Sequence, residues 1–188
     1  MLENLLELER DWFFAINGSH TWWLDKIMFF FASPWVWSPP IIVVLFFFFK
    51  RQNDKMLMLV FTILIAATTI VVAEYLIKPY FSRFRPTSHP LFLDDVRIYC
   101  NYIADGAYGF ISSHSANAFA FATMSAFVVK KCWYSFAIIF WAFVMVYSRV
   151  YLGAHFITDV IPGMIVGIFT GWVFYLLYKF MLIKWKII

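Results

Sequence analysis

Charged side chains are scarce in this sequence of 188 residues, in which Asp, Glu, Lys and Arg together make up 14%. A soluble domain carries about 25% of such residues. The chain is instead 63% hydrophobic and 23% aromatic, with a mean hydropathy of +0.77. The shortage of charge argues against an ordinary water-soluble domain, and the surplus of apolar side chains predicts a surface that faces lipid.

Cysteines and clustered basic residues are also scarce. Cys100 and Cys132 are too few for a disulfide framework, and the topology predicted below places them on opposite sides of the bilayer, so we expect no disulfide. No basic stripe accompanies the net charge of +4, which argues against a nucleic-acid partner. The first ten residues contain Glu3, Glu7 and Glu9 where a signal peptide would be cationic, so none is expected.

Long apolar runs dominate what is present. About 20 apolar residues cross the hydrocarbon core of a bilayer as a helix. We therefore predict an all-α, polytopic membrane helix bundle in which residues 1–188 form a single domain. The five predicted spans are residues 27–49, kinked by three prolines, and residues 56–77, 114–129, 133–148 and 156–178.

The N-terminal segment and two stripes of small residues indicate how helices pack and where they lie. Residues 2–16 combine leucines and aromatics with acids, which indicates an amphipathic helix lying at the membrane interface or packed on the protein's own surface. The small residues favour close packing between helices. They are Gly163, Gly167 and Gly171 in one span and Ala118, Ala122 and Ala126 in another.

The placement of cations predicts the orientation. Five spans put the two termini on opposite sides, and one set of span ends carries eight cations with Asp54 as its only acid. The positive-inside rule puts this set in the cytoplasm. We therefore predict an inner-membrane protein whose N-terminus and long loop, residues 79–112, are extracytoplasmic. The eight cations are Lys50, Arg51, Lys55, Lys130, Lys131, Lys179, Lys184 and Lys186.

Polar residues gather at the outer ends of the predicted spans, where charge is costly and usually marks a functional site. Arginine offers planar forks to a phosphate, lysine a point charge, and serines before a helix leave free N–H groups for an anion. These residues are Lys78, Arg85, Ser112, Ser113, His114, Ser148, Arg149, His155 and Asp159.

Two acids have partners suggested by four-residue spacing. Asp159 follows His155 by four residues, so the two would share a helix face and the carboxylate would orient the imidazole for attack on phosphorus. His114 is then free to protonate the leaving oxygen. Glu74 precedes Lys78 by one helical turn and is predicted to face and orient it.

Three sequence blocks carry a family resemblance. Lys78–Pro86 matches K-x6-R-P, Ile111–His114 matches P-S-G-H imperfectly, and Ser148–Asp159 matches S-R-x5-H-x3-D in full. The chain thereby resembles the type 2 phosphatidic acid phosphatase superfamily, whose membrane core the surrounding helices fit. Isoleucine in place of proline and Ser113 in place of glycine put pocket tightness and substrate preference in question.

The resemblance implies a phosphatase that needs no metal or other cofactor and forms a phosphohistidine. His155 would be the nucleophile, Asp159 its partner and His114 the general acid. The phosphate would be held by Lys78, Arg85, Ser112, Arg149 and the backbone N–H of Ser113.

The substrate implied is a lipid phosphate reached at the outer interface. Undecaprenyl diphosphate and the phosphates of lipid A are favoured, with phosphatidylglycerol phosphate and phosphatidic acid as further candidates. Phosphotransfer to another hydroxyl would use the same residues, and a non-catalytic binder or carrier would leave the His–Asp pair superfluous. A vanadate haloperoxidase shares the family's anion site, but five apolar spans argue against that soluble class. Most charges of the loop are expected to be solvated, with some as headgroup contacts: Arg83, His89, Asp94, Asp95, Arg97 and Asp105.

Overall fold

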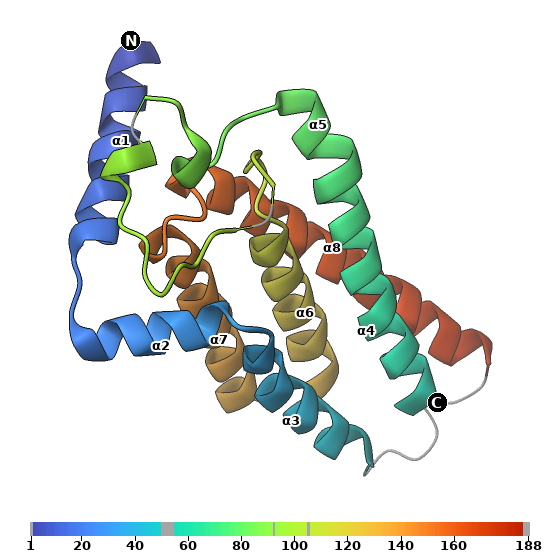
Figure 1. Cartoon of the computed structure of the whole chain (residues 1–188). Helices are drawn as coiled ribbons and strands as arrows, with labels where there is room; N and C mark the ends of the chain where they lie inside the picture. Colours follow the sequence, from blue (N-terminus) through green and yellow to red (C-terminus); the bar gives the residue numbers. More distant parts are fainter. Residues whose placement is uncertain (1, 50–54, 92, 105, 186–188) are drawn as a thin grey trace.

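The computed structural model describes residues 2–49, 55–91, 93–104 and 106–185, and in this part of the chain it is a bundle of helices with one isolated β-bridge (Figure 1). The all-α class is therefore confirmed. The helices are α1 (Leu2–Gly18), α2 (Trp22–Ala32), α3 (Ser38–Phe49), α4 (Lys55–Ile70), α5 (Lys78–Phe81), α6 (Ser113–Val129), α7 (Cys132–Tyr151) and α8 (Ile157–Lys184). Short pieces are the 3-10 turns η1 (Pro34–Trp37), η3 (Pro86–Ser88) and η4 (Leu93–Asp95) and the π-helix η2 (Val71–Ile77).

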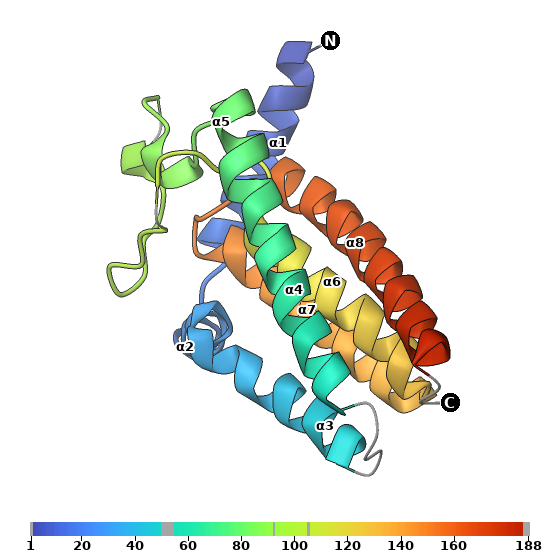
Figure 2. The same cartoon turned by 90° about the vertical axis from the view of Figure 1, so that its right-hand side faces the viewer.

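Of the five predicted spans, the described residues support three, or four when a bent pair of helices is counted as one span. Three helical stretches are long and apolar enough to cross a membrane: Leu57–Phe81, Cys132–Tyr151 and Ile157–Lys184. The bent pair Trp22–Ala32 and Pro34–Phe46 meets the same requirement only when its two helices are taken together. α6 has 17 residues and packs on α4, α7 and α8, so it forms the middle of the bundle (Figure 2).

The prediction of one kinked span over residues 27–49 needs correction. Proline lacks an N–H and ends the preceding helix, and here Ser33 turns to an extended conformation before Pro34. The two halves meet at 70°. α2 also begins earlier, at Trp22, because the charge of Asp25 is buried against Arg97 of the loop.

The contact between α6 and α8 depends on glycine. A methyl group at Gly167 would collide with the carbonyl oxygen of Ala116, and one at Gly171 with that of Ala120. The backbones therefore approach more closely than side chains would allow. The predicted alanine stripe does not form this contact; Ala118 and Ala122 are buried in the main hydrophobic cluster instead.

α1 combines the two arrangements considered for it. Glu9, Phe13 and Asn17 form a buried stripe toward α7 and α8, so one face packs on the protein. Leu8 and Trp12 remain exposed beside this stripe, as an apolar flank that would suit a membrane interface. The buried face thus centres on two polar residues rather than on the leucines.

Candidate active site

A cavity of about 390 Å³ lies where α6 begins and α7 ends. Both histidines of the predicted site line it, together with the two arginines predicted to bind phosphate, Arg85 and Arg149. Lys78, Ser112 and Asp159 are buried behind this wall rather than in it. The lining is Ala32, Pro34, Glu74, Arg85, Tyr102, Ile103, Ala104, Ser113, His114, Arg149, Ala154 and His155.

The His155 ring has its two nitrogens in different surroundings. Arg85 Nη1 donates to His155 Nε2 at 2.8 Å, so Nε2 carries a lone pair and the proton resides on Nδ1. Nδ1 faces Asp159 Oδ2 at 3.6 Å, which is longer than a hydrogen bond. The arrangement leaves the lone pair of Nε2 beside the cationic wall of the cavity.

The shared helix face predicted for this pair is wrong. α8 begins at Ile157 and Phe156 is extended, so His155 approaches from the connection between α7 and α8. Asp159 lies in the first turn of α8, where its Oδ2 accepts the Phe156 N–H at 3.0 Å. The carboxylate caps the helix and faces the imidazole at the same time.

Burial and positive charge keep the His155 imidazole neutral. The side chain is fully enclosed, and this desolvation lowers its pKa well below the ordinary value. The cations Arg85, Lys78 and Arg149 lower the pKa further, and Glu74 opposes them weakly. A neutral imidazole at physiological pH is the form that can attack an electrophile.

Arg149 is a buried cation without a carboxylate partner among the residues described. Its Nη1 donates to the Tyr102 hydroxyl at 2.6 Å and its Nη2 to the Ala32 carbonyl at 3.2 Å. Its Nε is buried and meets no hydrogen-bond acceptor within the described chain. Because a buried charge is costly unless compensated, this side of the cavity is suited to an anion.

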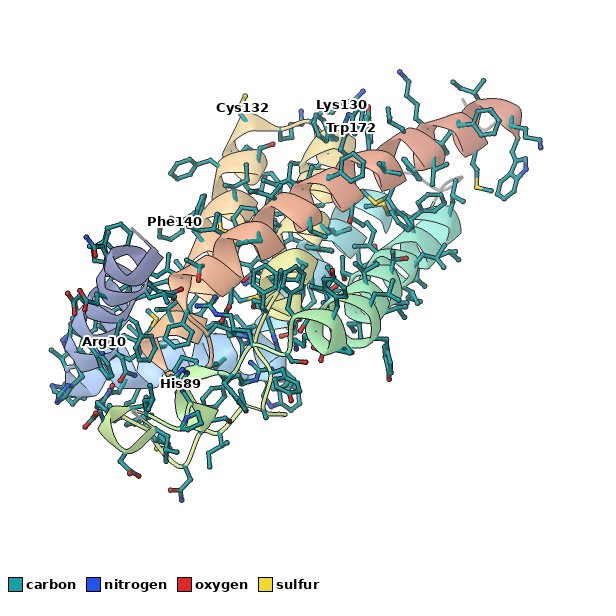
Figure 3. The ribbon with its side chains drawn as sticks, turned by 90° about the horizontal axis from the view of Figure 1, so that it is seen from above. Arg10, His89, Lys130, Cys132, Phe140 and Trp172 are labelled. Atoms are coloured by element: carbon teal, nitrogen blue, oxygen red, sulfur yellow. The ribbon has the colours of Figure 1, made fainter. Side chains whose placement is uncertain are left out.

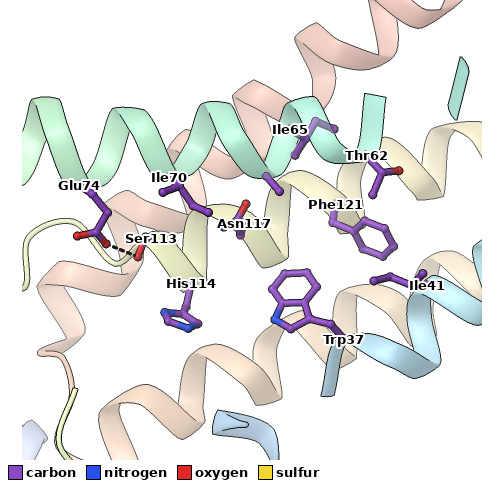
Figure 4. A pocket seen from close by; sticks show the side chains of 11 residues that line it. Trp37, Ile41, Thr62, Ile65, Ile70, Glu74, Ser113, His114, Asn117 and Phe121 are labelled. Atoms are coloured by element: carbon purple, nitrogen blue, oxygen red, sulfur yellow. Dashed lines mark hydrogen bonds between the residues drawn. The ribbon is translucent and has the colours of Figure 1, made fainter. Parts of the chain in front are cut away.

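Glu74 organises the opposite wall. It accepts a hydrogen bond from Lys78 Nζ, the contact that the four-residue spacing predicts, and another from Ser113 Oγ at 2.8 Å (Figure 4). Glu74 lies in the π-helix, an irregularity often found at functional sites. Ser112 caps α6 by accepting the Ser115 N–H at 3.3 Å, so its hydroxyl faces the helix rather than the cavity.

An apolar groove of about 480 Å³ adjoins the cavity. The two share Glu74, Ser113 and His114, and Figure 4 shows the His114 ring directed into the groove beside Trp37. Farther along, the groove is lined by α3, α4 and α6 through Ile41, Thr62, Ile65, Ala66, Ile70, Asn117 and Phe121. One histidine therefore stands at the junction of a cationic cavity and an apolar groove.

Several loop residues differ from their predicted roles. Arg83 and Arg97 are only partly exposed and form ion pairs: Arg83 pairs with Glu9 and Asp159, and Arg97 pairs with Asp25. Asp94 and Asp95 are exposed, as expected, and Asp105 lies outside the described residues. The loop itself begins at Ser82, because α5 extends to Phe81.

Gly109 is a site residue that the sequence did not reveal. A methyl group there would lie 3.0 Å from Asp159 Oδ2 and 3.4 Å from His155 Nδ1. Its N–H donates to the Arg83 carbonyl at 2.8 Å, beside the β-bridge between Phe84 and Tyr108. A glycine in a long polar loop resembles an ordinary turn residue, so only the packing identifies its role.

Comparison with known proteins places the chain in a family. The model of the PAP2 superfamily matches residues 56–181. The chain belongs to the PAP2 superfamily. Lipid A 4'-phosphatase of Porphyromonas gingivalis is 34% identical over 98% of this chain and 78% of its own, and the protein of the same name from Bacteroides thetaiotaomicron is 30% identical over 93% and 79%.

Two crystal structures share the fold. Aquifex aeolicus LpxE superposes with a TM-score of 0.66 at 26% identity, covering 89% of this chain and 94% of that one. The PAP2-type phosphatidylglycerolphosphate phosphatase of Bacillus subtilis gives 0.67 at 25% identity, covering 96% and 87%. With its family and its membrane helices, this PAP2 protein is a membrane lipid phosphatase, a hydrolase of phosphate ester bonds. The reading as a non-catalytic carrier is thereby disfavoured.

Proposed function

We propose that this PAP2 enzyme removes a phosphate from a lipid A-type glycolipid by way of a phosphohistidine on His155. The observation that carries the proposal is the single cavity in which two imidazoles and two buried arginines meet at the mouth of an apolar groove. A phosphate fits the cations and the attached lipid fits the groove. The names of the two curated relatives favour lipid A over the other candidate lipids.

The first step transfers the phosphoryl group to the enzyme. The lone pair of His155 Nε2 attacks phosphorus, the bond from phosphorus to the ester oxygen breaks, and His114 donates a proton to that oxygen. Arg85, which donates to Nε2 in this structure, would turn to a phosphate oxygen when the nucleophile engages. Its companions Lys78, Arg149 and the N–H of Ser113 would stabilise the charge on the other oxygens.

The second step returns the enzyme to its starting state. Water attacks the phosphohistidine with His114 accepting its proton, and the bond between phosphorus and Nε2 breaks to release inorganic phosphate. Asp159 stabilises the imidazolium form of His155 while the group is attached. All these steps use only water and groups of the protein itself, so the proposal includes activity without a metal or other cofactor.

The domain and its orientation are part of the same proposal. Residues 1–188 would act as one PAP2-like unit in the inner membrane, with the cavity at the extracytoplasmic face. Lys130, Lys131, Lys179 and Lys184 support this. The first two follow the end of α6 and the last two lie in the final turns of α8, both far from the cavity. Four other residues of the orientation argument, Lys50, Arg51, Asp54 and Lys186, lie outside the described residues, as does the side chain of Lys55.

The test is phosphate release by the purified protein in detergent with EDTA present. The panel comprises lipid A, undecaprenyl diphosphate, phosphatidylglycerol phosphate and phosphatidic acid. We expect the fastest release from lipid A, and mass spectrometry of the products locates the position hydrolysed and detects any transfer to another hydroxyl. Loss of activity in EDTA would contradict the metal-independent mechanism.

The nucleophile is tested with a matched pair of histidine variants. His155→Ala should lose at least about 10³-fold in kcat, because covalent catalysis requires its lone pair. His20→Ala removes an exposed histidine outside the cavity and should retain wild-type activity. Rapid quenching in base should trap an acid-labile phosphoryl label on the wild type and none on His155→Ala. Substantial turnover by His155→Ala would remove His155 from its proposed role.

A further inference from the structure

A second layer of charge lies behind the His155–Asp159 pair. Arg83 Nη1 donates to Asp159 Oδ1 at 2.7 Å, and Arg83 Nη2 donates to Glu9 Oε2 at 2.5 Å. Thr158 completes the group by accepting from Arg83 Nη1 and donating to Glu9. The guanidinium also lies over the Phe156 ring, 4.9 Å from its centre. One arginine therefore joins the first helix to the first turn of α8.

The two oxygens of Asp159 have divided tasks. Oδ1 receives Arg83, whereas Oδ2 receives the Phe156 N–H and faces His155 Nδ1. Because each oxygen has its own donor, the carboxylate cannot rotate without breaking one of them. Asp159 is completely buried, so no water replaces a lost donor without a rearrangement.

The arginine is held from both sides. Its backbone carbonyl accepts the Gly109 N–H at 2.8 Å, which fixes the start of the loop over the site. Glu9 comes from the buried stripe of α1, and this helix lies outside residues 56–181 that the family model matches. A segment outside the matched core thus supplies a charge that reaches the His155 ring through Arg83 and Asp159.

We propose that Glu9 and Arg83 are positioning residues, in which Glu9 competes with Asp159 for Arg83 and so sets how much negative charge Asp159 presents to His155. The inference rests on the roles proposed above for His155 and Asp159. Because the two acids share one cation, removing Glu9 and removing Arg83 change the effective charge of Asp159 in opposite senses. Without Glu9 the arginine serves Asp159 alone, and without Arg83 the carboxylate is uncompensated.

The proposal predicts that the two variants shift the pH dependence of activity in opposite directions. The acid limb is the range of low pH in which kcat/KM falls as His155 becomes protonated. The other charged groups near His155 are Arg85, Lys78, Arg149 and Glu74, with His114 across the cavity, and all stay unchanged in these variants. Arg83→Gln removes a positive charge, favours protonated His155 and moves the acid limb of kcat/KM to higher pH. Glu9→Gln removes a negative charge and moves the limb to lower pH. By Coulomb's law each shift is roughly half to one pH unit.

The experiment measures kcat/KM against pH for wild type, Glu9→Gln and Arg83→Gln with one lipid phosphate, so the ionisation of the substrate is common to all. Limbs that move in opposite directions support the proposal. Limbs that stay in place, or move together, overturn it. Arg83→Lys covers the case in which Arg83→Gln does not fold. Lysine keeps the positive charge but cannot contact both acids as the guanidinium does, so we expect a lower kcat with the acid limb unmoved. A wild-type kcat in Arg83→Lys would count against the proposal.

A second ion pair provides the control. Arg97 donates to Asp25 at 2.6 Å. The side chains of Arg97 and Asp25 are 25% and 8% exposed, close to the 28% and 8% of Arg83 and Glu9. Asp25→Asn should lower the melting temperature and leave the acid limb unmoved; a shift as large as that of Glu9→Gln would overturn the proposal. The result for His155→Ala distinguishes a failure of the proposed function from a failure of this inference. Turnover in that variant ends the proposed function, whereas an inactive His155→Ala leaves the pH profiles to decide this inference alone.

Discussion

The cations on the two walls of the cavity differ in whether an acid neutralises them. Lys78 and Glu74 neutralise each other on one side, while Arg149 on the other has no acid among the described residues. Both cations are almost wholly buried. The positive charge of Arg149 is therefore uncompensated within the described residues, and the phosphate group of a lipid substrate would supply the missing negative charge.

Glu74 is the residue whose removal should show how far this balance matters. In Glu74→Gln the shape is kept, but Lys78 loses its counter-ion and Ser113 a charged acceptor. A hydrogen bond to a charged group contributes about 1.5–3 kcal/mol, so we expect kcat/KM to fall by about ten- to a hundredfold. Asp94→Asn, at an exposed acid of the loop, should be neutral. Equal kinetics in both variants would show that Glu74 does not act on the site.

Single residues also mark where the sequence was insufficient. The residues of the three blocks were predictable, because phosphate chemistry requires those side-chain types. Arg83 was assigned to solvent because its partner Glu9 lies 74 positions away, and nothing local joins a loop arginine to the first helix. Gly109 was missed since its requirement comes from the packing of Asp159 against it.

At the scale of helices, the predictable elements are those with uninterrupted apolar runs. α6, α7 and α8 begin and end within a few residues of the predicted bounds, apart from the longer C-terminal end of α8. The π-helix around Glu74 has no sequence signature, because a π-turn differs from an α-turn only in the spacing of its hydrogen bonds. The break at Pro34 was predictable, but the 70° angle between the two halves was not, because proline ends a helix without fixing the direction of the next one.

The α6–α8 contact is the element on which the site geometry depends. α6 carries His114 and α8 carries Asp159, and Gly167 lies between the two helices. In Gly167→Ala the new methyl group meets the Ala116 carbonyl and the Phe119 side chain, so the helices must separate. Overpacking of this kind costs about 1–3 kcal/mol, and we expect a lower melting temperature in detergent and a lower kcat.

Gly18→Ala is the matched control for that variant. A methyl group at Gly18 has no atom within 4 Å, so its stability should change by no more than about 0.5 kcal/mol. Gly167→Ala and Gly18→Ala with the same melting temperature and the same kcat would show that the close approach of α6 and α8 is dispensable.

For the whole molecule, the sequence predicted the bundle because lipid burial constrains it strongly, and it predicted the gathering of polar residues at one end of the helices. The arrangement of α1 was less determined, since an amphipathic helix can face lipid or protein with the same pattern. In the structure one face of α1 packs on α7 and α8, while apolar side chains beside it stay exposed. The burial of Glu9 and Asn17 could not be predicted from the sequence, because it depends on contacts of α1 with α7 and α8.

The orientation in the membrane can be tested with the chain's own cysteines. Cys100 lies in the loop over the site and Cys132 begins α7 at the other end of the bundle; both are exposed free thiols. Figure 3 shows Cys132 beside Lys130 and well away from His89 of the loop.

If the cavity is extracytoplasmic, a membrane-impermeant maleimide added to intact spheroplasts should label Cys132→Ser, which keeps Cys100. Cys100→Ser, which keeps Cys132, should be labelled only after lysis. A soluble cytoplasmic thiol protein that stays unlabelled before lysis shows that the membranes were sealed. The reverse labelling pattern would invert the proposed orientation, because the two thiols lie at opposite ends of helices that cross the bilayer.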